Sequence, residues 1–458
     1  MKFYNREKEI KILSQKITSN NFEFIYLLGK RRVGKTELIT HLNNNILQKD
    51  FYYIFVEKSD LKVFLQKQEK YIYEKTGLKY NFETIEDFLD FFFLQSDLNL
   101  LVIDEFQNFN NVDKSIFSIF QKKIDQYQNK SNKKIIVLGS LQSLMIKIFE
   151  NSKEPLYKRA TFNLFIKEFD LDTQVEILKD IFGKNYNHQI LLDIYSIFGG
   201  IAYYLKSIYR ENYDKYELNQ ILKDLFFDEF ALFKNEGKEI LIEEFGMKYK
   251  RFFAIIEAIS VGKNKRNEIM DQVGLGTGEI DLYLKELIDI YDIIEVDYPF
   301  LESKKNISKY KIKDNFIEFW FKYIYSNKDK FELGLYDLVL ENVLKDFEKY
   351  KGFKFEKLVK DFLILENKKG NLDFTFTKIG TWLDRKNNEI DIIYTDEKEN
   401  IVFLECKLNE NRINQSEINQ LKNNVSLFLN KNQKFLDKNI KIGFAIFDIK
   451  NIVKFDYI

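Results

Sequence analysis

Gly29-Lys30-Arg31-Arg32-Val33-Gly34-Lys35-Thr36 is the stretch that decides the fold of this 458-residue chain. It matches the pattern G-x-x-x-x-G-K-[ST], a loop whose backbone amides surround the phosphates of a nucleoside triphosphate. An apolar run at residues 22–28 precedes it, and helix-forming residues follow at 36–42. Strand, loop and helix in this order are the context that the motif needs, because the loop amides and the N-terminal end of the helix both attract phosphate.

The loop residues have expected roles in binding ATP. Lys35 is expected to reach the β- and γ-phosphates, and the Thr36 hydroxyl is expected to ligate Mg²⁺. Of the two arginines, we expect one to contact phosphate and the other a partner domain. The residues expected to contact the nucleotide from this loop are Gly29, Arg31, Arg32, Val33, Gly34, Lys35 and Thr36.

A second apolar run, at residues 100–103, ends in Asp104 and Glu105. In a P-loop core this strand lies beside the phosphate loop, so Asp104 is expected to hold Mg²⁺ and Glu105 to polarise the attacking water as the catalytic base. Ser140 ends the next apolar run, where many such ATPases sense the γ-phosphate. Arg159 has two open interpretations: contact with a γ-phosphate in cis or in trans, or an ordinary solvated arginine.

Composition excludes several other classes of protein. The formal net charge is zero, so any contact with DNA must come from a local patch rather than from an overall positive charge. One cysteine and two histidines exclude an intrachain disulfide and argue against a Cys/His metal site. No signal peptide opens the sequence and no run approaches the ~18 apolar residues of a membrane span, so we expect a cytoplasmic protein without a membrane partner.

Hydrophobic periodicity predicts four successive parts, bounded at 1–170, 171–245, 246–327 and 328–458. In the first part, short apolar runs alternate with amphipathic stretches, which predicts a doubly wound parallel sheet. Those runs lie at residues 22–28, 52–56, 98–103, 134–138 and 162–169. The second part has helical periodicity throughout and is expected to be a helical lid.

The third part has the pattern of a winged helix-turn-helix. Its expected helices and wing strands are 252–260, 265–273, 277–289, 292–296 and 310–312. Thr277 is the expected N-cap of the third helix. After a charged amphipathic segment from 328 to 351, the last part is expected to be an α/β domain with helices at 353–365 and 415–429 and strands at 374–379, 389–394, 401–406 and 442–447.

Charged residues alternate along two of these last strands. Residues i and i+2 of a strand share a face, so Glu405 and Lys407 point together. The turn-like residues 395–400 pair the strands as a hairpin, which can bring Asp391 to the same spot. Two carboxylates and a lysine at a sheet edge suit Mg²⁺-dependent phosphodiester cleavage, with Lys407 stabilising the developing charge. The alternative is an ordinary hairpin of alternating charge.

Two helical residues are expected to support this catalytic set of Asp391, Glu405 and Lys407. Glu356, on the preceding helix, is expected to complete a metal shell with Asp391 and Glu405. Gln420, on the following helix, is expected to contact DNA or to support the lysine.

Further motifs along nearly the whole chain carry a family resemblance: residues 3–9, the phosphate loop, 103–107, Gly139-Ser140, Leu144-Met145, 155–159, Gly199-Gly200, 310–321 and 379–382. With them the chain resembles the archaeal-type P-loop ATPases of the AAA+/STAND group that carry a C-terminal DUF234 domain, although Ala202 and Leu408 stand where that family usually has proline and tryptophan. The resemblance implies a multidomain α/β fold in which a P-loop parallel sheet is followed by a helical lid, a winged helix and a restriction-endonuclease-like α/β domain. It also implies PD-(D/E)xK nuclease activity for that last domain.

The third helix of the winged helix carries four acids and one lysine, which is unfavourable beside DNA phosphates. A protein-interaction or packing role is therefore the preferred prediction for it. DNA contact is expected from a basic cluster in the last part: Lys349, Lys351, Lys354, Lys357, Lys360, Lys368, Lys369, Lys378, Arg385, Lys386 and Lys407.

These patterns predict an enzyme that binds and hydrolyses ATP with Mg²⁺ and whose nucleotide state controls a Mg²⁺-dependent nuclease acting on DNA. The alternative is a STAND-like switch whose C-terminal domain binds nucleic acid or a protein without cutting. A DNA-transacting motor is a weaker reading, because no second motor motif is visible. The oligomeric state stays open, with a homo-oligomer among the options.

Overall fold

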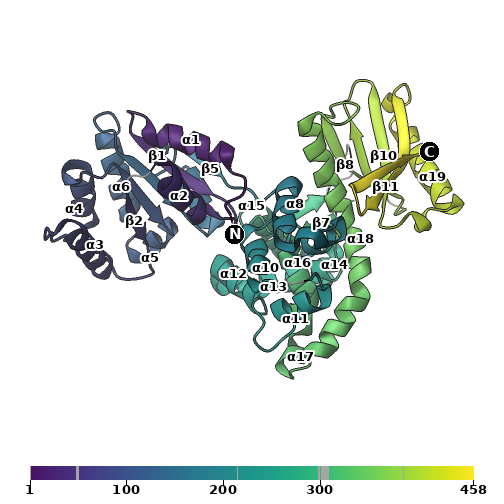
Figure 1. Ribbon diagram of the computed structural model, residues 1–458, viewed down its shortest axis with the longest axis horizontal. Helices are drawn as coiled ribbons and strands as arrows, with labels where there is room; N and C mark the ends of the chain where they lie inside the picture. Colours follow the sequence, from purple (N-terminus) through teal and green to yellow (C-terminus); the bar gives the residue numbers. More distant parts are fainter. Residues whose placement is uncertain (1, 48–50, 214, 298–299, 301–308, 385) are drawn as a thin grey trace. The chain divides into compact units, whose positions relative to one another are not determined.

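The computed structural model describes residues 2–47, 51–213, 215–297, 300, 309–384 and 386–458 (Figure 1). The chain divides into two compact units, Met1–Glu168 and Phe169–Ile458. Arg385, one member of the predicted basic cluster, lies outside the described residues.

The first unit is built on a parallel sheet of order β2-β3-β4-β1-β5. Its strands are β1 (Glu23–Leu28), β2 (Tyr52–Phe55), β3 (Leu100–Asp104), β4 (Lys134–Leu138) and β5 (Phe162–Phe165). All residues of β1, β3 and β4 are buried, as expected of central strands covered on both faces. The five predicted strands are confirmed, although β5 ends four residues earlier than predicted.

Helices cover both faces of this sheet. One apolar layer joins Leu13 of α1 and Leu38 of α2 to Ile25 and Leu27 of β1. The other layer is rich in phenylalanine and joins the remaining helices to the opposite face. The helices of this unit are α1 (Glu7–Thr18), α2 (Lys35–Leu42), α3 (Leu61–Thr76), α4 (Ile85–Asp90), α5 (Phe109–Val112), α6 (Ile116–Tyr127) and α7 (Gln142–Glu150).

The second unit begins with helices. They are α8 (Leu171–Phe182), α9 (His188–Phe198), α10 (Ala202–Glu211), α11 (Leu218–Phe226) and α12 (Glu236–Phe245). A three-helix and two-strand module follows, with α13 (Tyr249–Ser260), α14 (Arg266–Val273), α15 (Thr277–Asp289), β6 (Ile294–Asp297) and β7 (Lys309–Ile312). The order and spacing agree with the winged-helix prediction. The predicted N-cap is wrong by one residue, because Gly276 occupies the cap and Thr277 is the first helical residue.

A single helix of 34 residues, α18 (Tyr336–Lys369), leads into the last sheet (Figure 1). The sequence predicted separate segments at 328–351 and 353–365, but the helix passes through Gly352 without a break. The shorter α16 (Asn315–Phe319) and α17 (Lys328–Glu332) precede it. At about 1.5 Å per residue, α18 is roughly 50 Å long.

The C-terminal sheet is mixed, of order β12-β11-β10-β9-β8, and only the β10–β11 pair is parallel. Its strands are β8 (Lys378–Leu383), β9 (Glu389–Thr395), β10 (Asn400–Lys407), β11 (Asn439–Asp448) and β12 (Ile452–Tyr457), with α19 (Gln415–Lys431) on one face. The first strand starts four residues later than predicted, and β12 was not predicted. Among the described helices, none is both long and apolar enough to cross a membrane.

Candidate nucleotide site and carboxylate cluster

The phosphate loop leaves the carboxyl end of β1 in a conformation that requires glycine. Gly29 has a φ of +147°, and a Cβ atom there would lie 2.5 Å from the carbonyl oxygen of Ile166. Arg6, from the opening stretch, braces the loop by donating hydrogen bonds to the carbonyl oxygens of Val33, at 3.4 Å, and Lys167, at 2.6 Å. No role was predicted for Arg6, because only the fold brings it to the loop.

Lys35 is the first residue of α2 and is buried beneath the loop. Its ammonium group donates hydrogen bonds to the carbonyl oxygens of Gly29, at 2.7 Å, and Lys30, at 2.9 Å. These contacts hold the positive charge at the N-terminal end of a helix, where a phosphate is also attracted by the helix dipole.

Thr36, on α2, and Asp104, at the end of β3, meet as predicted, although β4 lies between β1 and β3 in the sheet. The Thr36 hydroxyl donates to Oδ2 of Asp104 at 2.7 Å, and the Tyr53 hydroxyl donates to the same oxygen at 2.8 Å. The other carboxylate oxygen accepts the backbone N–H of Glu105 at 2.9 Å. Hydroxyl and carboxylate oxygens are the ligands that Mg²⁺ prefers, so this donor set fits the expected ion.

Tyr53 was not predicted, because one tyrosine in a buried strand carries no functional signal. Burial and then the negative charge of Asp104 raise its pKa, so this hydroxyl remains a hydrogen-bond donor.

Glu105 and Ser140 also come together. The Ser140 hydroxyl donates to Oε2 of Glu105 at 2.8 Å, and the side-chain amide of Gln107 donates to the same oxygen. Glu105 has a left-handed backbone with a φ of +56°, which is costly for a residue other than glycine and is typical of functional positions. The carboxylate is therefore oriented by two neighbours, one predicted and one not.

Arg159 is not brought to the phosphate loop within this unit. Its Nε atom pairs with Oδ1 of Asp125 at 2.9 Å. Arg159 precedes β5, which runs parallel to β1, whereas the loop follows β1. Arg159 therefore lies at the amino end of the strands and the loop at their carboxyl end. At about 3.3 Å per residue, these two ends are roughly 16 Å apart. A contact of Arg159 with a γ-phosphate, in cis or in trans, stays a prediction.

The second constellation forms where β9 begins and β10 ends. Leu404 and Ile392 are paired partners in this antiparallel hairpin, so Asp391 and Glu405 lie at the same end of it. The backbone N–H of Cys406 donates to Oδ2 of Asp391 at 2.8 Å, and Lys407 Nζ lies 3.3 Å from Oε1 of Glu405. The structure thus brings Asp391, Glu405 and Lys407 together.

Three carboxyl groups at this end are electrostatically linked. Burial and then repulsion from Asp391 raise the pKa of Glu405 to about 8. Burial and repulsion from Glu389 raise the pKa of Asp391 to about 6, against the opposing hydrogen bond from Cys406. Burial and the charge of Asp391 also raise the pKa of Glu356, on α18. Glu356 therefore lies close enough to the hairpin carboxylates to be repelled by their charge, and the sequence predicted that it would lie near them.

Lys407 is held by a glutamate that the sequence analysis missed. Its ammonium group lies 2.5 Å from Oε2 of Glu417, in the first turn of α19. Gln420, which was expected to support the lysine, is exposed one turn further along. Nearby acids raise the pKa of Lys407 against the effect of burial, so it stays charged.

Two further lysines approach the cluster from β7. Lys309 Nζ donates to both carboxylate oxygens of Glu389 at 3.1 Å each. Lys311 pairs with Asp297 at 2.6 Å, and its charge also acts on Glu356 and Asp391. Nothing in the sequence around residues 309–311 signalled this, because the approach depends on how the strand pair β6–β7 packs. Within the described ranges, no three Asp, Glu, His or Cys side chains form a group that could hold a metal ion as they stand.

The predicted basic cluster does not form a continuous surface. Lys351 pairs with Asp193 at 2.9 Å, and both side chains are only 5% exposed. Lys354 is equally buried and pairs with Glu318 at 2.5 Å. Lys357, Lys369 and Lys407 are likewise bonded to other parts of the unit. Lys351, Lys354 and Lys357 therefore lie against protein, because α18 turns them towards it. DNA contact by the other basic residues stays a prediction.

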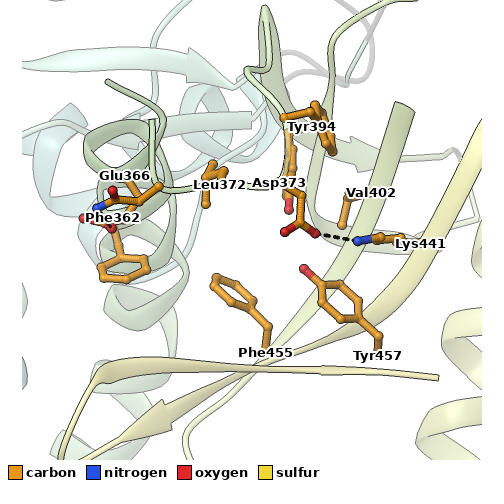
Figure 2. A pocket seen from close by; sticks show the side chains of 11 residues that line it. Phe362, Glu366, Leu372, Asp373, Tyr394, Val402, Lys441, Phe455 and Tyr457 are labelled. Atoms are coloured by element: carbon orange, nitrogen blue, oxygen red, sulfur yellow. Dashed lines mark hydrogen bonds and ion pairs between the residues drawn. The ribbon is translucent and has the colours of Figure 1, made fainter. Parts of the chain in front are cut away.

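A separate hollow of about 270 Å³ opens on the other face of the C-terminal sheet (Figure 2). Val402 lines it, and it lies an odd number of residues from Glu405 and Lys407, so it points the opposite way. Aromatic rings dominate the lining, and Lys441 pairs with Asp373 across it at 2.5 Å. This hollow is therefore distinct from the carboxylate cluster.

A parallel sheet with a phosphate loop between β1 and α2 and a carboxylate at the end of β3 define a P-loop ATPase domain. Residues 3–208 match the family described as "ATPase domain predominantly from Archaea". Residues 320–421 match DUF234, described as "Archaea bacterial proteins of unknown function".

A relative covers almost the whole chain. Uncharacterized protein MJECL04 of Methanocaldococcus jannaschii is 36% identical over 410 residues, which are 88% of this chain and 87% of that protein. The chain therefore belongs to the archaeal-type ATPases with a C-terminal DUF234 domain, as the resemblance predicted.

More distant proteins agree with this assignment. Uncharacterized ATP-binding protein MJ0632 of the same organism is 25% identical over 80% of this chain and 93% of its own length. Among solved structures, the Walker-type ATPase paby2304 of Pyrococcus abyssi has a TM-score of 0.53 at 19% identity, over 70% of this chain and 96% of that one. That likeness concerns the fold alone.

Proposed function

We propose that this ATPase uses its nucleotide state to control a Mg²⁺-dependent nuclease in its C-terminal domain, with DNA as the substrate. The observation that carries the proposal is the gathering of Asp391, Glu405 and Lys407 with Glu356 at one end of the C-terminal sheet. Mutually repelling carboxylates lower the stability of the folded state, so structure alone does not account for them. Groups with perturbed pKa values concentrate at functional sites.

In the ATPase domain, the chain's residues have separate tasks. Lys35 would contact the phosphates, Thr36 and Asp104 would hold Mg²⁺, and Glu105, oriented by Ser140, would position the attacking water. A bound ion would neutralise phosphate charge.

In the C-terminal domain, Asp391 and Glu405 are the proposed metal ligands, with Glu356 completing the set. Their raised pKa values fit this role, because a cation would offset the repulsion that keeps them protonated. Lys407, fixed between Glu405 and Glu417, is placed to stabilise charge that develops on a phosphate.

Helix α18 supplies the proposed link between nucleotide state and cleavage. Two contacts bind it to α9 of the lid: Lys351 with Asp193 at 2.9 Å, and Asp361 with the Tyr195 hydroxyl at 2.6 Å. Glu356 lies between these two contacts on the same helix. A movement of the lid that shifts α9 therefore reaches the carboxylate cluster through one rigid element.

The test is a cleavage assay on plasmid, linear and single-stranded DNA and on RNA, with Mg²⁺ or Mn²⁺ and with or without ATP. We expect cleavage by the wild type, none by Glu405→Gln, and altered ATP dependence in Lys35→Ala. Glu410→Gln is the matched control, because Glu410 is an exposed glutamate on the same domain. Equal digestion by the wild type and Glu405→Gln would refute the nuclease assignment.

A switch that binds nucleic acid or a protein without cutting is the second candidate. It is favoured by the finding that no three described acidic, His or Cys side chains form a ready metal-binding group. This candidate predicts ATP turnover and nucleotide-dependent capture of DNA or a protein, with no cleavage of any substrate by the wild type.

A further inference from the structure

The strand pair β6–β7, the wing of the winged-helix module, is seated on the C-terminal sheet. The backbone N–H of Phe300 donates to the carbonyl oxygen of Thr381 at 2.5 Å, and the Thr381 hydroxyl donates to Asp297 at 3.2 Å. The Phe300 ring is buried in the core of the C-terminal domain, where its centroid lies 6.2 Å from that of Phe428. We call this contact between the wing and the C-terminal sheet the seat of the wing; it combines hydrogen bonds with apolar packing.

The seat also depends on a residue without a side chain. A Cβ atom at Gly380 would lie 3.1 Å from Cδ2 of Phe300, closer than ordinary packing allows. Gly380 is in β8, which pairs with the strand that carries Asp391. Absence of a side chain at 380 lets the wing approach the hairpin that carries the carboxylate cluster.

In this position, the wing places two positively charged lysines beside the carboxylate cluster. Lys309 binds both oxygens of Glu389, and Lys311, held by Asp297, acts on Glu356 and Asp391. A lysine ammonium satisfies carboxylates as a single charge with directional hydrogen bonds, whereas a divalent ion needs several oxygens around one point. The two lysine charges therefore disfavour a divalent cation at the neighbouring carboxyl groups.

We propose that the wing is an autoinhibitory element of the C-terminal site: while it is seated, Lys309 and Lys311 place two positive charges beside the carboxylates that a divalent cation must bind, and the site becomes competent when the wing withdraws. The inference rests on the proposed metal-dependent function and names its regulation. It explains why the described carboxylates are in electrostatic contact without forming a group that could hold a metal ion.

The wing is also bonded to its own module. The backbone N–H of Tyr310, between the two lysines, donates to the carbonyl oxygen of Asn264 at 2.8 Å, just before α14. A displacement of the winged-helix module would therefore withdraw both lysines together.

The test measures Mn²⁺ binding to the full chain without nucleotide, by the loss of the electron paramagnetic resonance signal of free Mn²⁺. Lys35→Ala serves as the background for all variants, so that Mn²⁺ bound with residual nucleotide does not contribute. We expect Lys311→Met to bind Mn²⁺ at the C-terminal site on the order of tenfold more tightly, the change expected when one nearby like charge is removed. Lys454→Met, which removes a lysine paired with Glu410 on the same domain, should leave the affinity unchanged.

A second variant separates the seat from the charge. Gly380→Val should push Phe300 aside and raise Mn²⁺ affinity in the same direction while keeping both lysines. Unchanged or weaker Mn²⁺ binding in both variants would overturn the inference, and weaker binding with lower cleavage would make the lysines part of the substrate site instead.

The two proposals fail separately. Wild-type Mn²⁺ affinity in both variants with normal DNA cleavage removes the autoinhibition and leaves the nuclease. Tighter Mn²⁺ binding without cleavage of any substrate removes the nuclease and leaves the wing as a regulator of cation binding.

Discussion

Replacing Glu405 by glutamine should stabilise the second unit at neutral pH while it removes cleavage. In the wild type, burial and the charge of Asp391 raise the pKa of Glu405 to about 8, from an ordinary value of 4.5. Between these two values the folded state holds a proton that the unfolded state has lost. The free energy of unfolding therefore falls as the pH rises through this window, by at most ~1.4 kcal/mol per pH unit.

The size of this loss in the free energy of unfolding follows from the pH range between the two pKa values. From pH 4.5 to 7.5 the upper limit is about 4 kcal/mol. The Glu405 side chain is 25% exposed, so solvent screening lowers the expected effect to about 1–2 kcal/mol. For a unit of this size, 1 kcal/mol corresponds to roughly 2–4 °C, so the melting temperature of Glu405→Gln should rise by about 2–8 °C at pH 7.5.

Differential scanning calorimetry in EDTA at pH 5.0 and 7.5 measures this. The gain should be present at pH 7.5 and nearly absent at pH 5.0, where the wild-type glutamate is already protonated in the folded state. Glu410→Gln is the control, because that side chain is 57% exposed. A Glu405→Gln variant that melts below the wild type at pH 7.5, or a gain of equal size at both pH values, would refute the assignment of Glu405 to a repelling carboxylate cluster.

Three other predictions concern the nucleotide site and the lid. Glu105→Gln should keep ATP binding and lower the hydrolysis rate by about 10²-fold or more, as measured by phosphate release, since general-base catalysis contributes that much; an unchanged rate would contradict its role. Gly29→Ala should destabilise the first unit by about 1–3 kcal/mol in urea unfolding, because the φ of +147° and the close carbonyl both disfavour a side chain. Lys351→Met should destabilise the second unit by about 3–5 kcal/mol, because Asp193 would remain buried without its lysine; the double variant Lys351→Met/Asp193→Asn should recover part of this loss.

Short stretches of sequence were enough to predict the strands and the nucleotide site of the first unit. The phosphate loop and the apolar runs around it specify a strand, a turn and a helix through residues that are adjacent in sequence. Thr36 and Asp104 could be placed together because a P-loop core sets the strand that ends in Asp104 beside the loop. Arg159 could not be placed in this way. Its position depends on the direction of β5 relative to β1, which decides at which end of the strands Arg159 lies. A short motif does not contain that information.

The second unit shows what a pattern of charges leaves undetermined. Lys351 and Lys354 look like surface residues in the sequence, but the continuous helix α18 turns them into the packed interior, where Asp193 and Glu318 neutralise them. The hairpin of Asp391, Glu405 and Lys407 was predictable because its residues are close in sequence. Lys309 and Lys311 approach it from more than 70 positions away, and only tertiary packing reveals them.

The uninterrupted helix α18 bears on how this family can evolve. The stretch that matches DUF234 begins at residue 320, yet the helix that enters it is bonded along its length to Asp193, Tyr195 and Glu318, which lie upstream of that boundary. A recombination event at the boundary would separate each buried lysine from its acid. The C-terminal domain is therefore expected to be inherited together with the lid, as one cassette, and chimaeras between relatives should fold only when both come from the same parent.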